Sequence, residues 1–157
     1  MTIRPMNIRK AAQPDLDGVR DCARQAYALY VPRMGKEPAP MVADFAAQIR
    51  AGKLHVVELE GGELDGRVAG FVVLYPRGDH LHVENVAVLP AAQGKGVGKA
   101  LLAFAEDEAR RLGLPAVELY TNVKMTENQA FYPALGYVET DRREEDGFSR
   151  VFYRKPL

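Results

Sequence analysis

Apolar residues recur at helical spacing in four segments of the chain. The first segment predicts a helix from about residue 14 to residue 30, with its apolar face formed by Leu16, Val19, Cys22, Ala23, Ala26 and Tyr27. Further helices are predicted at 41–51, 99–112 and 126–135, each followed directly by a glycine. Glycine often terminates a helix, because it adopts the left-handed backbone conformation without strain.

Runs rich in β-branched and aromatic residues, separated by short turns, predict strands. These strands cover residues 2–10, 53–60, 67–75, 80–89, 115–121, 137–141 and 148–154. The charged segment 142–147 is expected to form the turn between the last two strands. Short connections favour antiparallel pairing, whereas the connection from 80–89 to 115–121 passes through a helix and favours a parallel pair.

The element order is therefore β-α-α-β-β-β-α-β-α-β-β. It predicts an α/β fold with a mixed, mostly antiparallel sheet, one parallel pair and helices on both faces. We found no internal repeat, low-complexity tract or linker in the sequence. We therefore expect residues 1–157 to form a single domain.

Charge and cysteine content narrow the class of protein. The 157 residues include 21 Lys plus Arg and 21 Asp plus Glu, so bulk charge indicates neither a nucleic-acid nor a membrane surface. No run approaches the roughly 20 apolar residues of a membrane span, and the N-terminus lacks a secretory-signal pattern. The single cysteine, Cys22, excludes an internal disulfide and favours a reducing compartment, so we expect a cytoplasmic protein. Its place in the first helix's apolar pattern indicates a core residue rather than a nucleophile.

A glycine-rich segment joins the 80–89 strand to the next helix, and it reads Gln93-Gly94-Lys95-Gly96-Val97-Gly98-Lys99. Alternating glycines let a ligand approach the backbone, and the N–H groups of the helix start favour an anion. Lys95 and Lys99 add positive charge. The segment therefore predicts a site for a phosphate or pyrophosphate group.

Two familiar phosphate-binding motifs do not fit this segment. A P-loop requires G-x-x-x-x-G-K-[S/T], but Gln93 stands at the first glycine and Ala100 at the hydroxyl position. A dinucleotide fingerprint requires G-x-G-x-x-G, but Lys99 stands at the third glycine.

The pattern that fits is Q-x-x-G-x-G, formed by Gln93, Gly96 and Gly98 and flanked by the apolar runs 86–90 and 100–102. A second motif follows downstream, Asn128-Gln129-Ala130-Phe131-Tyr132 and then Leu135-Gly136-Tyr137. Together the two motifs closely resemble the acetyl-CoA-binding signature of the GNAT superfamily of N-acetyltransferases. The resemblance is densest over residues 82–138 and weak before residue 50, and the predicted element order also matches the family fold.

The resemblance implies acetyl-CoA as cosubstrate. In the family, the loop amides hold the CoA pyrophosphate, and the pantetheine arm enters a gap where the strand (here 84–88) splays from its parallel neighbour (here 117–121). Asn128 would contact the pantetheine or the ribose-phosphate side of the cofactor. The cofactor-binding residues implied in this way are Val86, Ala87, Val88, Gln93, Gly94, Lys95, Gly96, Val97, Gly98, Lys99, Asn128 and Tyr132.

Acetyl transfer to an amine requires a base for the amine, a donor for the thioester carbonyl and an acid for the leaving thiolate. Tyr132 stands where the family places its acid, and the adjacent Phe131 is expected to fill the core and leave Tyr132 facing the ligand. Glu84 stands where several members carry a catalytic carboxylate, although an ordinary salt-bridged glutamate is an equally good interpretation. The Val86 N–H is the expected donor to the carbonyl.

His80, His82 and Glu84 alternate on one strand and so share a face, which leaves a metal trio as an alternative. We expect no metal, and we expect His82 and Glu84 to line the acceptor pocket, with His82 helping to conduct the proton. Tyr30 and Arg33 are further candidates for contact with the acceptor, whereas the 142–146 segment is expected to neutralise its own charges.

These inferences predict an N-acetyltransferase that moves an acetyl group from acetyl-CoA to a primary amine by direct transfer. The acceptor would be a small molecule or the amine of a peptide or protein, and a homodimer is possible. The alternative is a sensor module that binds acyl-CoA without turnover.

Overall fold

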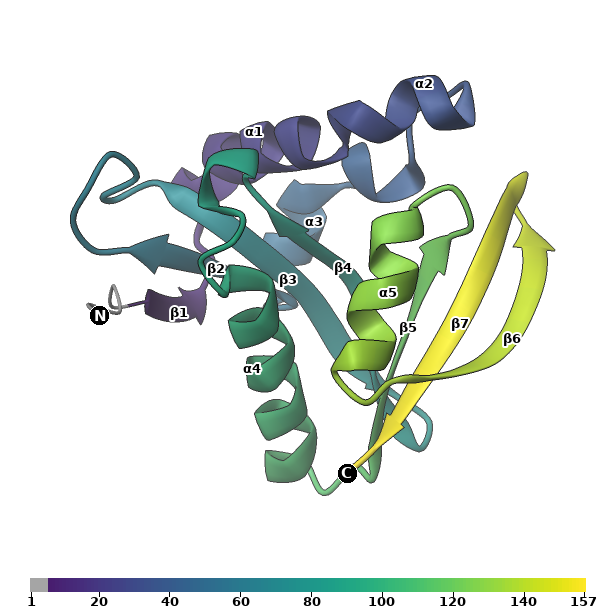
Figure 1. Ribbon diagram of the computed structural model, residues 1–157. Helices are drawn as coiled ribbons and strands as arrows, with labels where there is room; N and C mark the ends of the chain where they lie inside the picture. Colours follow the sequence, from purple (N-terminus) through teal and green to yellow (C-terminus); the bar gives the residue numbers. More distant parts are fainter. Residues whose placement is uncertain (1–5) are drawn as a thin grey trace. The chain divides into compact units, whose positions relative to one another are not determined.

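The computed structural model describes residues 6–157 (Figure 1). Its strands are β1 (Met6–Lys10), β2 (Leu54–Leu59), β3 (Val68–Arg77), β4 (His80–Val88), β5 (Ala116–Asn122), β6 (Val138–Glu145) and β7 (Phe148–Pro156). Its helices are α1 (Leu16–Tyr27), α2 (Val31–Met34), α3 (Phe45–Arg50), α4 (Val97–Arg111) and α5 (Thr126–Ala134). The predicted order of strands and main helices is confirmed, with the short α2 as an addition. Residues 2–5 of the predicted first strand lie outside the described residues.

The seven strands form a sheet in the order β1-β2-β3-β4-β5-β7-β6. β4 pairs in parallel with β5 through Leu81–Val83, as the intervening helix predicts. The β1–β2, β2–β3, β5–β7 and β6–β7 pairs are antiparallel, so the predicted mixed sheet is confirmed. β7 lies between β5 and β6 although it follows β6 in the chain (Figure 1).

The chain divides into two compact units. The first consists of the residues up to 73 together with 85–102, and the second consists of 74–84 and 103–157. Strands β3 and β4 and helix α4 each contribute to both units, so the boundary runs through elements rather than through a linker. The expectation of a single domain stays a prediction.

In the first unit, helices pack on both faces of the strands. Phe45 of α3 meets Phe71 of β3 edge to face, with ring centroids 5.5 Å apart. The neighbouring Gly70 points the other way, toward Leu101 of α4. Cys22 of α1 is fully buried, and burial raises the pKa of its thiol to about 12, which confirms a core role.

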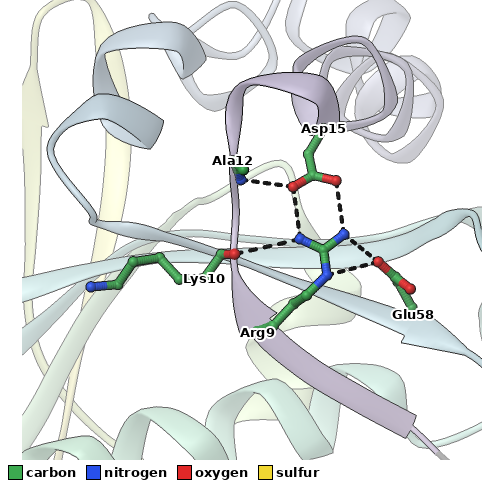
Figure 2. Close-up of polar contacts among 5 residues, drawn as sticks. All are labelled: Arg9, Lys10, Ala12, Asp15 and Glu58. Carbon is green, nitrogen blue, oxygen red and sulfur yellow. Dashed lines mark hydrogen bonds and ion pairs between the residues drawn. The ribbon is translucent and has the colours of Figure 1, made fainter.

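An arginine ties β1 to β2 and to the start of α1 (Figure 2). The Arg9 guanidinium donates to both carboxylate oxygens of Asp15, at 2.8 and 2.9 Å, and to the Glu58 carboxylate. Asp15 also accepts from the Ala12 backbone N–H at 2.7 Å. These hydrogen bonds favour the ionised carboxylate, so Arg9 holds the pKa of Asp15 below its usual value.

In the second unit, α5 and the later part of α4 pack on one face of the strands. The ring centroid of Tyr132 lies 5.7 Å from that of Tyr153 on β7. Glu106 of α4 is buried and accepts from the Tyr137 hydroxyl at 3.2 Å and from Lys155 Nζ at 2.8 Å. A buried carboxylate with two donors avoids the cost of an unpaired charge, so this contact fixes α4 against β7.

Two differences in element boundaries change how a segment is interpreted. α4 begins at Val97 rather than at residue 99, so Gly98 belongs to its first turn. β6 continues to Glu145, so most of the predicted charged turn is strand and the reversal occurs at Asp146 and Gly147.

Within residues 6–157, no helix is both long enough and apolar enough to span a membrane.

Candidate functional site

The glycine segment forms a tight connection into α4. Gly94 and Gly96 have φ of +79° and +80°, which side-chain-bearing residues rarely adopt. The Ala100 N–H bonds to the Gly96 carbonyl at 3.0 Å, which closes the first turn of the helix. The N–H groups of Val97, Gly98 and Lys99 precede that bond, so helix geometry gives them no acceptor within α4. They form the positive end of a helix of 15 residues.

The space around this connection is open. A Cβ placed on Gly94 would meet no atom within 4 Å, and one on Gly96 would approach only Met6 Cε, at 4.0 Å. Lys95 and Lys99 are exposed, whereas Val97 is buried and anchors the helix start to the first unit. Outward-facing donors, two lysines and open space suit a phosphate-bearing ligand.

The end of β4 is packed tightly from behind. The Leu89 N–H bonds to the Ala69 carbonyl at 2.9 Å. A Cβ on Gly70 would lie 2.8 Å from the Ala87 carbonyl oxygen and 3.0 Å from Val97 Cγ1. Only a glycine allows this approach, so Gly70 sets the position of both the strand end and the start of α4.

A buried polar network holds the middle of β4, and the sequence interpretation missed it. The Tyr27 hydroxyl contacts Asn85 Oδ1 at 2.6 Å and the Val86 carbonyl oxygen at 3.2 Å. Asn85 Nδ2 donates to the Pro40 carbonyl at 3.0 Å. An asparagine in line with Leu81, Val83 and Ala87, on the apolar face of the strand, is the signal that would have indicated this network, because a buried amide requires partners.

Tyr30 and Arg33 lie together within the first unit. The Arg33 guanidinium is 5.3 Å from the centroid of the Tyr30 ring, and that ring lies 6.3 Å from Tyr27. Tyr30 is buried. These side chains therefore form one aromatic and cationic group on the segment between α1 and α3.

On α5 of the second unit, Asn128 and Tyr132 occupy one face. Asn128 Nδ2 lies 3.1 Å from Thr121 Oγ1 on β5. Tyr132 is only 4% exposed, with ring contacts to Tyr137 and Tyr153, whereas Phe131 is 37% exposed. The expectation that Phe131 fills the core is thus wrong, because the helix turns the tyrosine rather than the phenylalanine toward β7, and the ligand-facing role of Tyr132 stays a prediction.

Glu84 and His82 lie beside Tyr75 in the second unit. The Tyr75 hydroxyl donates to Glu84 Oε1 at 3.3 Å. The His82 ring centroid lies 5.3 Å from that of Tyr75 and 6.0 Å from that of Tyr120. Burial, with smaller effects from Arg77 and His80, lowers the pKa of His82 to about 4. An imidazole with that pKa is a weak base at neutral pH, which argues against the proton-conducting role that we expected.

The two histidines on β4 do not belong to one cluster of metal-type donors. His80 Nδ1 lies 3.1 Å from Asp79 and 3.3 Å from Glu118, and these residues form the one cluster of metal-type donors found in residues 6–157. Arg154 pairs with both carboxylates of that cluster. A guanidinium therefore already balances the charge there, and the alternating trio of His80, His82 and Glu84 is not brought together as a metal site.

The charged segment before β7 pairs mostly with side chains outside it. Arg142 lies 2.9 Å from Glu139, and Arg143 lies 3.1 Å from Asp141. Glu145 and Asp146 lie 3.4 and 3.7 Å from Arg150 on β7. The expected self-neutralising turn is therefore wrong, because residues 142–145 belong to strand β6 and reach neighbours along and across the hairpin.

The family follows from comparison with known proteins. The model of the acetyltransferase (GNAT) family matches residues 21–137, which is most of the chain. The chain belongs to the GNAT acetyltransferase family. The predicted family is therefore confirmed, and the matched range includes β4, the glycine segment and α5.

Among curated proteins, this GNAT chain is similar to the aminoalkylphosphonate N-acetyltransferase of Salmonella typhimurium, with 36% identity over 86 residues. The alignment covers 50% of this chain and 55% of that relative. The chain spans roughly half the length, or less, of the curated relatives that it matches.

Solved GNAT structures have the same fold over nearly the whole chain. The ribosomal-protein-S18-alanine N-acetyltransferase of Escherichia coli superposes with a TM-score of 0.72 at 22% identity, covering 97% of this chain and 94% of that one. The PaiA N-acetyltransferase of Thermoplasma acidophilum, solved with coenzyme A, gives 0.71 at 17% identity, covering 98% and 99%. At these identities the likeness establishes the fold.

Proposed function

We propose that this chain is an N-acetyltransferase that moves the acetyl group of acetyl-CoA to a primary amine by direct transfer. The observation that carries the proposal is the open connection at Gly94 and Gly96, which leads into the N-terminus of α4 in a chain of the GNAT family. The N-acetyltransferase names of its relatives support the same reaction class.

The donor groups of the first unit fit the CoA pyrophosphate. In this proposal the N–H groups of residues 97–99 donate to its phosphate oxygens, and Lys95 and Lys99 balance their charge. Val86, Ala87 and Val88 contact the pantetheine arm through their backbone. Gln93 and Asn128 provide further polar contacts, and the predicted splay of β4 from β5 makes room for the arm.

Acetyl-CoA supplies the acyl group as a thioester. The amine nitrogen forms a bond to the acyl carbon, the carbon–sulfur bond breaks, and the thiolate takes a proton. We assign that proton to the Tyr132 hydroxyl, whose ring is held by Tyr137 and Tyr153. Glu84 takes the proton that the amine loses, directly or through a water, and the Val86 N–H stabilises the developing oxyanion.

The acceptor is a primary amine. The relatives' names mention aminoalkylphosphonates and a ribosomal-protein alanine, so both a small molecule and a protein amine fit the family. Tyr30, Arg33 and His82 are the residues that we propose to contact it. The one buried cysteine suits a reducing, cytoplasmic setting, and a homodimer remains part of the proposal.

The cofactor assignment is tested by Gly96→Ala, with CoA binding followed by calorimetry. A side chain at φ of +80° strains the backbone that presents the helix N–H groups, so we expect affinity to fall at least about tenfold. Gly66→Ala is the matched control, because Gly66 has φ of +72° and open surroundings outside this segment. Equal affinity in all three proteins would remove the loop from the proposal.

The chemistry is tested by thiol release from acetyl-CoA with a panel of primary amines. We expect Tyr132→Phe and Glu84→Gln each to lower kcat about 100-fold while CoA affinity is retained. Phe131→Leu is the control for disturbance of α5. CoA binding by the wild-type protein with no turnover on any amine would favour the alternative, a non-catalytic acyl-CoA sensor.

A further inference from the structure

One face of the second unit carries a row of rings and charges on neighbouring strands. The row consists of Tyr75 on β3, His82 on β4, Tyr120 on β5, and Arg150 and Phe148 on β7. His82 lies 6.0 Å from Tyr120, ring to ring, and the Arg150 guanidinium is 4.5 Å from the Tyr120 ring centroid. Strand alternation places the row opposite Tyr153 and Thr121, which face α5. The row therefore lies on the face opposite α5.

His82 is a buried imidazole whose contacts within residues 6–157 are with other rings. Only 6% of the residue is exposed, and the ring centroids of Tyr75, His80 and Tyr120 lie 5.3, 6.4 and 6.0 Å from its own. Its low pKa keeps it neutral at physiological pH, so it carries one N–H donor and one acceptor nitrogen. Neither ring nitrogen is among the described side-chain atoms that are shut off from solvent without a partner, so both can form a hydrogen bond to a bound molecule.

Tyr120 and Arg150 offer further donors beside it. Within the described part of the chain, the Tyr120 hydroxyl has no hydrogen bond, and burial raises its pKa. The Arg150 side chain is 11% exposed, yet its one hydrogen bond among those residues is a long one, 3.4 Å, to Glu145. A guanidinium has five N–H donors, so most of its capacity to bind an oxyanion remains.

We propose that Arg150, Tyr120 and His82 bind an anionic group of the acceptor, and that the acceptor is a primary amine that carries a carboxylate or a phosphonate. The inference rests on the proposed function, because it assigns the substrate class of the same reaction. Glu84 lies at the other end of the row, bonded to Tyr75, and receives the amine. The row thus presents a carboxylate to the ammonium and a guanidinium to the anion of one zwitterionic molecule.

Two carboxylates already pair with the Arg150 guanidinium, and a substrate anion must displace them. Glu145 lies 3.4 Å and Asp146 3.7 Å from Arg150 Nη1, and their side chains are 38% and 86% exposed. Exposed ion pairs of this kind contribute little, since water solvates each partner almost as well. A substrate anion that is held by three donors in a half-buried site gains more from the same guanidinium.

The test compares kcat/KM within matched pairs of amines. One arm is β-alanine against β-alaninamide, and the other is 2-aminoethylphosphonate against ethanolamine, so the two arms separate carboxylate from phosphonate. We expect the wild-type protein to prefer the anionic member of at least one pair about tenfold or more, the effect of a hydrogen bond to a charged group. A preference for the neutral member in both pairs would overturn the inference.

Variants then assign the preference to this row. Arg150→Gln should lower the anionic-to-neutral ratio about 10- to 100-fold, Arg150→Lys should restore part of it, and Glu145→Gln should raise it. Arg142→Gln is the matched control on exposed strand β6, and it should leave the ratio unchanged. Equal ratios in Arg150→Gln and the wild-type protein would overturn the inference.

Calorimetry with 2-aminoethylphosphonate and β-alanine, in the presence of CoA, separates this inference from the proposed function. Binding that Arg150→Gln abolishes, with no turnover on any amine, would support the anion site and refute the proposed transfer. Turnover of amines without any preference for the anionic member would support the proposed transfer and refute the anion site.

Discussion

The close approach of β3, β4 and α4 at Gly70 predicts an unusually severe effect from one added methyl group. In Gly70→Ala, the new Cβ would lie 2.8 Å from the Ala87 carbonyl oxygen, 3.0 Å from Val97 Cγ1 and 3.3 Å from Leu101 Cδ1. Ordinary carbon contacts begin at about 3.5 Å, so the first two overlaps are each half an ångström or more. The carbonyl belongs to the strand backbone, which cannot turn aside as a side chain does.

Forcing one methyl group into a well-packed interior costs about 1–3 kcal/mol, and the backbone contact places this variant in the upper half of that range. At about 2 kcal/mol, a chain of this length should lose about 4–8 °C in Tm. Urea unfolding and a thermal scan measure the loss. Because Ala87 and Val97 flank the proposed cofactor segment, CoA affinity should fall as well.

Gly18→Ala is the comparison, since its Cβ would meet no backbone atom and only the side chain of Val68, at 2.9 Å from Cγ2. Val68 must shift, but replacing a helical glycine recovers up to about 1 kcal/mol of helix propensity, so this variant should lose less stability than Gly70→Ala. If Gly70→Ala were as stable as the wild type within 0.5 kcal/mol, a value well below the smallest cost expected for overpacking, the account of this contact would be wrong.

Two further predictions concern polar contacts. Asp15→Asn should lower the free energy of unfolding by about 1–2 kcal/mol at pH 7. The pKa of Asp15 is lower in the folded than in the unfolded state, so its carboxylate stabilises the fold above the unfolded pKa, and protonation removes that stabilisation. The difference between variant and wild type should therefore shrink below about pH 4. Urea unfolding of both proteins from pH 3 to 7 measures this difference, and a difference independent of pH would contradict the stabilisation of the ionised Asp15 carboxylate by Arg9. Asn85→Leu should cost about 2–3 kcal/mol, because the Pro40 carbonyl loses its side-chain donor and the Tyr27 hydroxyl keeps only its longer contact with the Val86 carbonyl. Hydrogen exchange should then speed up in residues 28–41 before other segments, and a uniform change would argue for a general loss of stability instead.

Periodicity and turn chemistry were enough to predict the order of strands and main helices, including the parallel β4–β5 pair. They gave wrong element boundaries where one residue type is common in two kinds of local structure. Gly98 has a low helix propensity, so the predicted helix began after it, although a helix N-terminus that faces a ligand tolerates glycine. The charges at 142–145 suggested a turn, whereas charged side chains are equally common on an exposed edge strand such as β6.

The candidate site was predictable only where one local motif defines it. The 93–99 segment and Asn128 with Tyr132 carry such motifs. The row of His82, Tyr120 and Arg150 does not, because strand register between β4, β5 and β7 brings these side chains together. No local pattern revealed that β7, rather than β6, pairs with β5.

That strand order also has a consequence for how the chain folds. Within residues 6–157, β6 pairs with β7 alone, so the two form a hairpin that adds to β5 through β7. The β5–β7 register joins Ala116 to Pro156, a contact of long sequence separation that makes docking a slow step. Until it is complete, β5 presents an unpaired edge with Val117 and Leu119, which is a template for aggregation. Cells that produce shortened or stalled chains lacking residues 148–156 should therefore accumulate insoluble protein rather than a weakened enzyme.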